Sequence, residues 1–129
     1  MKVQLVVAKK TKRIICTAHD KGKTHDFKVF KKSKLPLNEK TKAKLDSGYQ
    51  GVQQLHSNSE IPKKSSKKKP LTAKDKAANR KLARERVMVE HVIGSIKIFR
   101  ILAERYRNRR TKHTQRVRLI CGIYNYQLK

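Results

Sequence analysis

Residues 84–102 read RERVMVEHVIGSIKIFRIL, and this stretch decides the helical half of the fold. Its apolar residues recur at steps of three and four, as they do along one face of an α-helix. We therefore expect one helix from about Asp75 to Tyr106. Glu90 lies beside the apolar stripe of this helix, so we expect it to be half-buried. A half-buried carboxylate needs a partner such as Arg86, four residues earlier, or a metal ion.

A second helix is expected over residues 114–127, where Val117, Ile120, Cys121 and Tyr124 form an apolar stripe at helical spacing. The two helices make up the C-terminal half of the chain. Because aromatic residues are only 5% of the sequence, any core between such helices must be aliphatic and modest.

Two short apolar segments open the chain, at residues 3–8 and 13–18, and a polar turn joins them. Their β-branched residues and this spacing predict an antiparallel hairpin. Because both segments are almost continuously apolar, we expect burial on both faces. A short helix over residues 26–34 should follow, with Thr24 or Asp26 as its cap.

A weak strand is expected over residues 41–45, and Asp46 follows it directly. The next turn reads DSGYQG, residues 46–51, and its two glycines indicate a specific turn geometry. A carboxylate at the end of a strand is held rigidly and suits a divalent metal ion. The other interpretation is an aspartate that caps the turn. The local pattern alone favours the turn cap.

Charge is the most extreme global property of the chain. Lys and Arg total 35 against 9 Asp and Glu, which gives a formal net charge of +26. A compact state with this charge repels itself unless a polyanion neutralises it, and nucleic acid is the commonest polyanion. No apolar run approaches the ~20 residues that cross a bilayer, and the basic residues have no apolar anchor. We expect a nucleic acid rather than a membrane as the partner.

The two cysteines, Cys16 and Cys121, lie within apolar patterns. This placement predicts reduced, buried thiols in a cytosolic protein. A metal site formed by Cys16, His19 and His25 is the alternative, although these residues follow no known ligand spacing. No apolar segment follows the first two residues, so no secretory signal is expected.

Three segments, in this order, resemble one family of enzymes. They are GKTHDFKVF at residues 22–30, DSGYQG at 46–51 and the helical stretch at 84–102. The sequence is similar to insertion-sequence transposases of the DDE type, and most similar to the insertion sequence five group. The pattern E-x-x-x-G-x-x-K-x-F, which begins at Glu90, supports the same resemblance. It implies DNA transposition, a form of DNA recombination, and an α/β fold with a ribonuclease-H-like core.

The resemblance also implies an active site. In that family three carboxylates bind two divalent metal ions, Mg²⁺ or Mn²⁺, which activate the attacking oxygen and stabilise the leaving oxygen. Asp46 matches the second carboxylate and Glu90 the third, so both are expected to be catalytic residues and metal ligands. Lys97 lies seven residues after Glu90, close to two helical turns, and is expected to hold a phosphate. A solvated lysine is the alternative for Lys97.

The family's first aspartate belongs on the opening strand of the sheet, and neither Asp20 nor Asp26 matches it. We therefore expect a core that lacks its first strand, exposes a sheet edge and is inactive on its own. Such a chain is a truncated copy or the second half of a transposase divided over two reading frames. Its partners would be DNA and an upstream transposase polypeptide or another transposase chain. Whether the chain alone is an enzyme stays open.

We expect one domain over residues 1–129, with a sheet part (1–55), a basic loop (56–76) and a helical part (77–129). The loop contains PKKSSKKKP, residues 62–70, which should be extended and solvated. In a bacterium such a protein is expected in the cytoplasm, bound to the nucleoid. The residues expected to contact DNA are basic side chains of the helical half and the loop: Arg84, Arg86, Lys97, Arg100, Arg105, Arg109, Arg110, Lys67, Lys68 and Lys69.

The alternative function is a non-catalytic basic protein that binds nucleic acid, such as a ribosomal or chromatin-like component. A translated remnant without a stable role is a third interpretation. Net charge does not distinguish the transposase from the non-catalytic basic protein, because both would bind phosphates. The acidic residues do, since a protein that only binds phosphates gains nothing from half-buried carboxylates.

Overall fold

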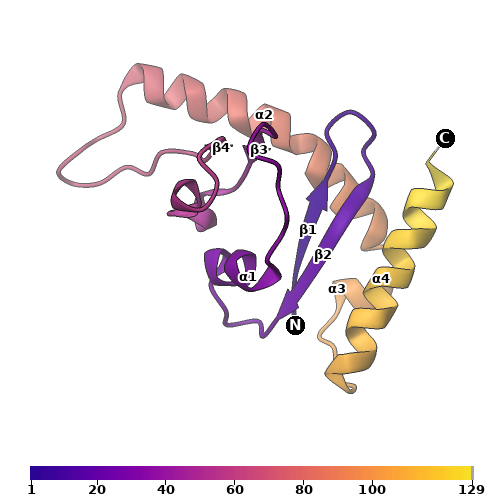
Figure 1. Ribbon diagram of the computed structural model, residues 1–129. Helices are drawn as coiled ribbons and strands as arrows, with labels where there is room; N and C mark the ends of the chain where they lie inside the picture. Colours follow the sequence, from indigo (N-terminus) through magenta and orange to yellow (C-terminus); the bar gives the residue numbers. More distant parts are fainter. Residues whose placement is uncertain (129) are drawn as a thin grey trace. The chain divides into compact units, whose positions relative to one another are not determined.

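The computed structural model describes residues 1–128 and contains both strands and helices, with the helices concentrated in the second half (Figure 1). The mixed α/β class and the helical C-terminal half are therefore confirmed. Two short 3-10 helices, η1 (Ser47–Tyr49) and η2 (Val52–Gln54), lie between the third and fourth strands. The strands and α-helices are β1 (Lys2–Val7), β2 (Ile14–Asp20), α1 (Asp26–Ser33), β3 (Ala43–Lys44), β4 (Ser59–Glu60), α2 (Ala73–Ile96), α3 (Arg100–Ala103) and α4 (Arg110–Gln127).

The chain divides into two compact units. The first unit contains residues 1–24 together with Met88 and the residues after it, and the second contains His25–Val87. Helix α2 therefore contributes its C-terminal part to the first unit and its N-terminal part to the second. Asp46 belongs to the second unit and Glu90 to the first.

The hairpin predicted at the start of the chain is confirmed in the first unit. β1 and β2 pair antiparallel, from Lys2 opposite Asp20 to Val7 opposite Ile14 (Figure 1). The expectation that both strands are buried on both faces is wrong, because Ile15 is 66% exposed. The pairing shifts register between Val6 and Val7, so Ile15 is an extra residue with no partner on β1. Such a bulge interrupts the alternation of side chains and leaves Ile15 in solvent.

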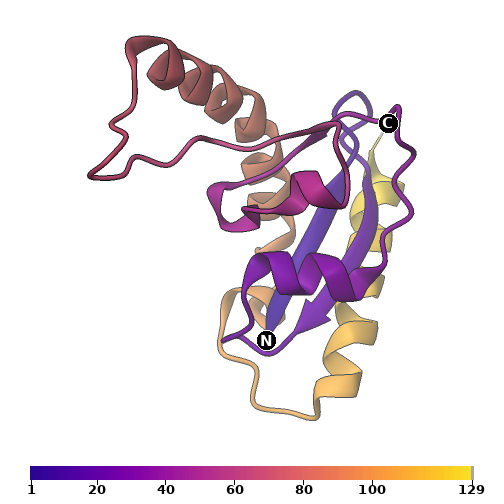
Figure 2. The same cartoon turned by 60° about the vertical axis from the view of Figure 1, so that its left-hand side comes forward.

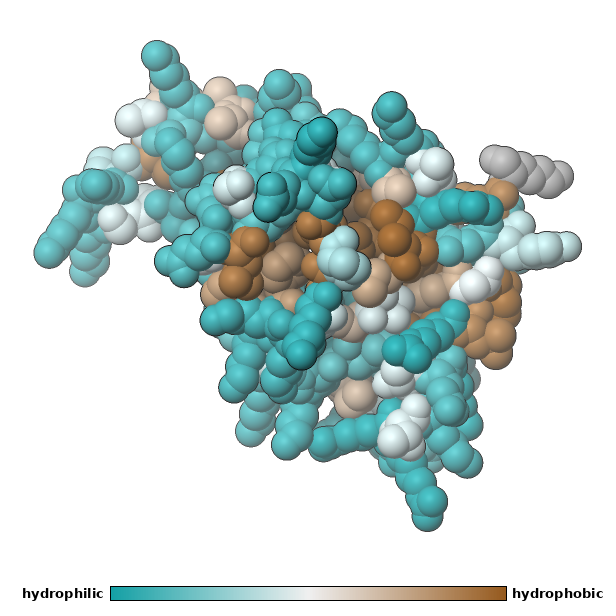
Figure 3. All heavy atoms as spheres, in the orientation of Figure 1, coloured by the Kyte–Doolittle hydropathy of each residue, from teal (hydrophilic) through white to brown (hydrophobic). Residues whose placement is uncertain are grey.

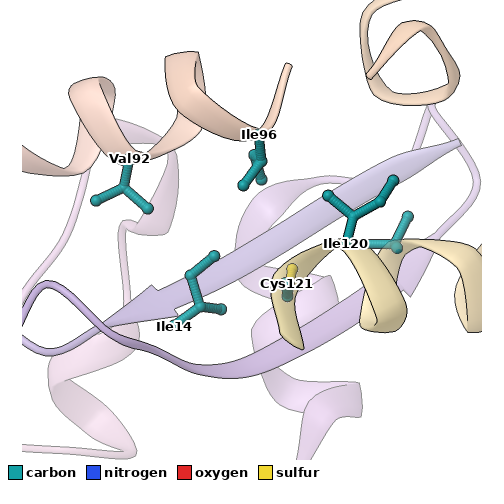
Figure 4. Close-up of a cluster of buried hydrophobic side chains, with 6 residues drawn as sticks. Ile14, Val92, Ile96, Ile120 and Cys121 are labelled. Atoms are coloured by element: carbon teal, nitrogen blue, oxygen red, sulfur yellow. The ribbon is translucent and has the colours of Figure 1, made fainter. Parts of the chain in front are cut away.

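The core of the first unit lies between the hairpin and two helices. Figure 4 shows side chains of α2, α4 and β2 pointing toward one another. The apolar stripe predicted for the last helix is confirmed, and the Cys121 thiol is free and buried, which raises its pKa. Six buried residues form this cluster: Ile14, Val92, Ile96, Val117, Ile120 and Cys121.

The side chain of Asn125, on α4, forms hydrogen bonds with the backbone of β2. Its Oδ1 accepts a hydrogen bond from the Ile14 N–H at 2.9 Å, and its Nδ2 donates to the Ile14 carbonyl at 2.8 Å. Each such bond contributes about 1 kcal/mol to the free energy of unfolding. One side-chain amide therefore satisfies both backbone polar groups of a buried strand residue and fixes the helix on the hairpin.

The long helix is shorter than predicted. α2 ends at Ile96, and Lys97–Phe99 form a turn before α3. This turn contains no proline or glycine, so the sequence carries no stop signal there. The change of direction lets Ile101 and Leu102 pack against the core cluster. The last helix, in contrast, begins at Arg110, before its predicted start.

In the second unit, α1 confirms the predicted short helix. Its N-cap is His25, whose side chain makes no capping hydrogen bond, so the expected cap at Thr24 or Asp26 is wrong. The helix ends where Lys34 adopts a left-handed conformation, with φ of 45°. Val29 and Phe30 are its buried residues.

β3 confirms the predicted strand before Asp46 in a shorter form, and it pairs in parallel with β4. β4 lies inside residues 56–76, which were expected to form only a loop, so that boundary is wrong. Residues 62–70 are exposed or half-exposed, as predicted, and Figure 2 shows the segment between β4 and α2 as a long loop.

The face of the molecule in Figure 3 is mostly hydrophilic, and its hydrophobic atoms gather in small patches. This distribution agrees with a sequence in which 34% of the residues are charged. Within residues 1–128, no helix is long and apolar enough to cross a membrane.

Two histidines, the buried His113 and the half-buried His19, make the stability of the first unit dependent on pH. Burial lowers the pKa of His113 and of His19 below the ordinary 6.5, and their ring centroids lie 6.1 Å apart. The folded state therefore keeps both imidazoles neutral at a pH where the unfolded chain protonates them. The free energy of unfolding should be highest above pH 6.5 and should fall as the pH drops below it toward the folded pKa values.

Urea unfolding at pH 7.5, 6.0 and 5.0 measures this effect. The lowered carboxyl pKa values of Glu60 and Asp75 place their titration below this window. The variant His113→Gln should show a smaller loss of stability than the wild type. A free energy of unfolding that stays constant from pH 7.5 to 5.0 would contradict the assignment.

Candidate functional site

Asp46 is separated from the end of β3 by Leu45 alone and lies where the chain turns into η1. It is the N-cap residue of η1, and its Oδ1 accepts a hydrogen bond from the Ser47 N–H at 2.6 Å. Its Oδ2 lies 3.2 Å from Nη2 of Arg86 on α2, and its side chain is 55% exposed. The carboxylate is therefore both a turn cap and a rigidly held group that solvent reaches.

The pairing of α2 with this turn involves two consecutive helix residues. Glu85 forms an ion pair with Lys44 of β3, and Arg86 pairs with Asp46, two residues further along. Lys44 also lies 3.8 Å from Glu60 of β4. Sequence reasoning missed this arrangement. Lys44 and Asp46 carry opposite charges two positions apart, and Glu85 and Arg86 carry the complementary charges in the same order. This complementary pair of charges is the sequence signal that could have indicated the arrangement.

Helix α1 packs closely against the DSGYQG turn. A Cβ on Gly48 would overlap Oδ2 of Asp26, and a Cβ on Gly51 would lie 3.3 Å from the ring of Phe27. Gly51 also has φ of 94°, a conformation that side chains disfavour. Gly51 is therefore required by its backbone conformation and by Phe27, whereas a side chain at Gly48 would displace the Asp26 carboxylate. These contacts hold α1 against the turn that carries Asp46.

Tyr49 lies half-buried in the same turn. Its ring packs edge-to-face against Phe30, with the ring centroids 6.3 Å apart. Burial, together with the carboxylates of Asp26 and Asp46, raises the pKa of Tyr49 to about 12. The phenol therefore stays protonated at any physiological pH and is a neutral group between two carboxylates.

The variant Gly51→Ala should lower the free energy of unfolding by about 2 kcal/mol. A left-handed conformation costs a residue with a side chain about 1–2 kcal/mol, and the added methyl group also meets Phe27. Gly22→Ala is the matched control, since a Cβ there meets nothing within 4 Å. Urea unfolding measures both. Equal stabilities of the two variants would contradict the packing of α1 against the turn.

Glu90 is exposed on α2, so the expectation that it is half-buried is wrong. It precedes the buried Val92 by two residues, which places it roughly 200° around the helix from that core position. The expected partner Arg86 pairs with Asp46 instead. Within residues 1–128, Glu90 has no ion-pair partner, and its carboxylate is available to a ligand.

Asp46 and Glu90 lie in separate units, and their joint action stays a prediction. Their carboxylate oxygens are ligands that Mg²⁺ prefers. No group of three or more His, Cys, Asp or Glu side chains that could hold a metal ion occurs within residues 1–128. An ion at Asp46 would compete with Arg86 for Oδ2.

The basic residues predicted to contact DNA are nearly all exposed. Lys97 lies in the turn after α2, and its N–H donates to the Ile93 carbonyl at 3.0 Å. Arg100 is exposed but forms an ion pair with Glu104 at 2.9 Å. Arg86 is the exception, because it is half-buried and pairs with Asp46. The remaining exposed residues are Arg84, Arg105, Arg109, Arg110, Lys67, Lys68 and Lys69.

The basic loop is anchored at its base. The Asn79 side chain accepts from the Lys63 N–H and donates to the Lys63 carbonyl, each at 2.9 Å. Lys63 Nζ also lies 2.6 Å from Asp75. At the tip, two backbone hydrogen bonds between Ser66 and Lys69 close a turn. The lysines of the tip therefore project from a fixed stem.

Comparisons with known proteins identify the class. The family model for DDE superfamily endonucleases matches residues 1–125, so the chain belongs to this superfamily. Over 128 residues it is 48% identical to a "Probable transposase for insertion sequence element IS702" from Microchaete diplosiphon. That match covers 99% of this chain and 46% of the relative, so the chain spans about half the length of the relative. No solved structure matches the chain. The resemblance to DDE-type transposases is confirmed.

Proposed function

We propose that this chain is part of a transposase and supplies residues for metal-dependent cutting and joining of DNA strands during transposition. The observation that carries the proposal is the 48% identity, over nearly the whole chain, to a probable transposase. Membership of the DDE endonuclease superfamily supports it independently of that relative. The fold that accompanies this proposal is a ribonuclease-H-like core.

Asp46 and Glu90 are the residues proposed to bind Mg²⁺ or Mn²⁺. When bound, such ions lower the pKa of the attacking hydroxyl and stabilise the leaving oxygen. The chain's own contribution is to hold the carboxylates. Asp46 is fixed by the Ser47 N–H and by the packing of α1 against its turn. Glu90 is exposed and has no ion-pair partner within residues 1–128, so no described partner has to be displaced from it.

DNA is the proposed substrate, and the bacterial nucleoid is the location that follows. The +26 charge supports a polyanionic partner. Lys97 and the loop lysines Lys67, Lys68 and Lys69 are exposed and suit contacts with phosphates. Another transposase chain or an upstream polypeptide is the proposed source of the further carboxylate.

The exposure of Glu90 removes one argument against a purely nucleic-acid-binding role, because that argument relied on half-buried carboxylates. Family membership favours the transposase, and an excision assay separates the two. A complete transposase that contains these residues should excise a marker flanked by element ends, and Asp46→Asn should abolish excision. If Asp46→Asn excises as efficiently as the wild type, Asp46 is not catalytic and the binding role is the better account.

A further inference from the structure

A hollow of about 340 Å³ in the first unit is lined by basic side chains from two separate segments. Lys21 comes from the loop after β2, and Arg105, Arg107 and Arg110 come from the connection between α3 and α4. The volume lies at the lower end of the ~300–1,000 Å³ found for small-ligand sites. No acidic residue lines this hollow.

None of these four cations has an ion-pair partner within residues 1–128. This separates them from Lys44, Lys63, Arg86 and Arg100, each of which pairs with a carboxylate. Like charges that converge without a counterion repel one another, and the cost falls when an anion enters. The hollow therefore has the electrostatic character of an anion site.

The loop that forms the hollow is held in place by specific contacts. Tyr106 Oη donates to the Arg109 carbonyl at 3.2 Å. The Tyr106 ring also packs edge-to-face against His113, with centroids 4.5 Å apart, and His113 is only 4% exposed. The basic side chains are therefore mounted on a fixed backbone.

The start of α4 adds to the positive potential. Arg109 is its N-cap and offers no side-chain acceptor, and the first turn contains no acidic residue. The first N–H groups of an 18-residue helix therefore lack a side-chain cap. Free N–H groups and the helix dipole favour a negative charge at this end of the helix. Arg110, the first residue of α4, is one of the residues that line the hollow.

We propose that this hollow, which belongs to a different unit from Asp46, binds a backbone phosphate of a DNA strand. The hollow alone supports the binding of a phosphate group. That this phosphate belongs to a DNA strand rests on the proposed function. Arginine, lysine and backbone N–H groups recognise phosphate without reading the base, so the contact should position DNA independently of its sequence. Lys21, Arg107 and Arg110 are the residues assigned to it, and only Arg110 was among the predicted DNA contacts.

The test compares two double variants of the full chain with the wild type. Arg107→Gln with Arg110→Gln removes two charges from the hollow. Arg13→Gln with Arg116→Gln removes two charges from exposed positions elsewhere in the same unit and is the matched control. Arg107→Lys with Arg110→Lys keeps the charge and detects a folding defect, since it should behave nearly as the wild type.

Two measurements are needed. Inorganic phosphate, followed by amide chemical shifts in NMR, should saturably shift residues 105–112 in the wild type and the control but not in the Gln variant. Duplex DNA binding should weaken about tenfold in the Gln variant, with the slope of log affinity against log salt reduced by about 1.

The outcomes separate this inference from the proposed function. If the Gln variant binds DNA as tightly as the control, the phosphate site is wrong while DNA binding stands. Phosphate shifts spread over all basic surfaces would also overturn the site. If the wild type fails to bind DNA yet phosphate shifts residues 105–112 saturably, the anion site stands and the transposase proposal fails.

Discussion

Replacing Glu90 with glutamine in a complete transposase that contains these residues is expected to lower the rate of DNA strand cleavage by at least ~10⁴-fold. Glutamine keeps the shape of the side chain and removes the negative charge that a metal ion requires. Carboxylates that share metal ions act as a unit, so the loss of one removes most of the catalysis. Because Glu90 is exposed and forms no ion pair in the part of the chain that the structure describes, the substitution should leave the free energy of unfolding unchanged.

Glu104→Gln is the matched control. Glu104 is also an exposed glutamate, with its side chain 62% exposed, and its ion pair with Arg100 is a surface pair of small energetic value. Single-turnover cleavage of labelled DNA measures both variants. A Glu90→Gln protein that cleaves at the rate of Glu104→Gln would show that Glu90 is not a catalytic residue.

The second large effect is expected in DNA binding. If the chain neutralises eight phosphates, log affinity should fall with log salt at a slope of roughly −7, which is on the order of a 10⁴-fold loss between 50 and 200 mM. Fluorescence anisotropy with labelled duplexes of unrelated sequence measures this slope, and the sequences should differ little. Binding isotherms that coincide at the two salt concentrations would contradict the expectation.

The loop lysines provide an internal comparison. Lys67→Gln, Lys68→Gln and Lys69→Gln together should reduce the magnitude of the slope by about 2 to 3, because each neutralised phosphate contributes about 0.9. The three residues are exposed at the tip of a loop whose base is fixed by Asn79. Their replacement should therefore leave the fold intact. An unchanged slope would remove the loop from the interface.

The sequence predicted the elements that have a local signal. β-branched residues on either side of a polar turn indicated the hairpin, and helical spacing indicated the stripe of α4. The glycines of DSGYQG indicated a specific turn, and Gly51 does have positive φ. These signals lie within a few residues of the structures they specify, so they are readable without knowledge of the rest of the chain.

Non-local pairings were not predictable in the same way. Arg86 was expected beside Glu90 because they lie one helical turn apart, but its partner is Asp46, forty residues away in the chain. The parallel pairing of β4 with β3 and the end of α2 at Ile96 likewise depend on distant partners. For the candidate site, the rigid placement of Asp46 followed from its position after a strand. The exposure of Glu90 depended on which face of α2 meets the core.

Our central proposal is that Asp46 and Glu90 serve a transposase active site together with a carboxylate from a further polypeptide segment. The most direct test is cleavage of labelled element-end DNA with Mn²⁺, comparing residues 1–129 with a chain extended upstream to include a strand that carries an aspartate. We expect no cleavage by residues 1–129 and robust cleavage by the extended chain, lost on Asp46→Asn or Glu90→Gln. Robust cleavage by residues 1–129 alone, abolished by Glu90→Gln, would contradict the account, as would an extended chain that never cleaves.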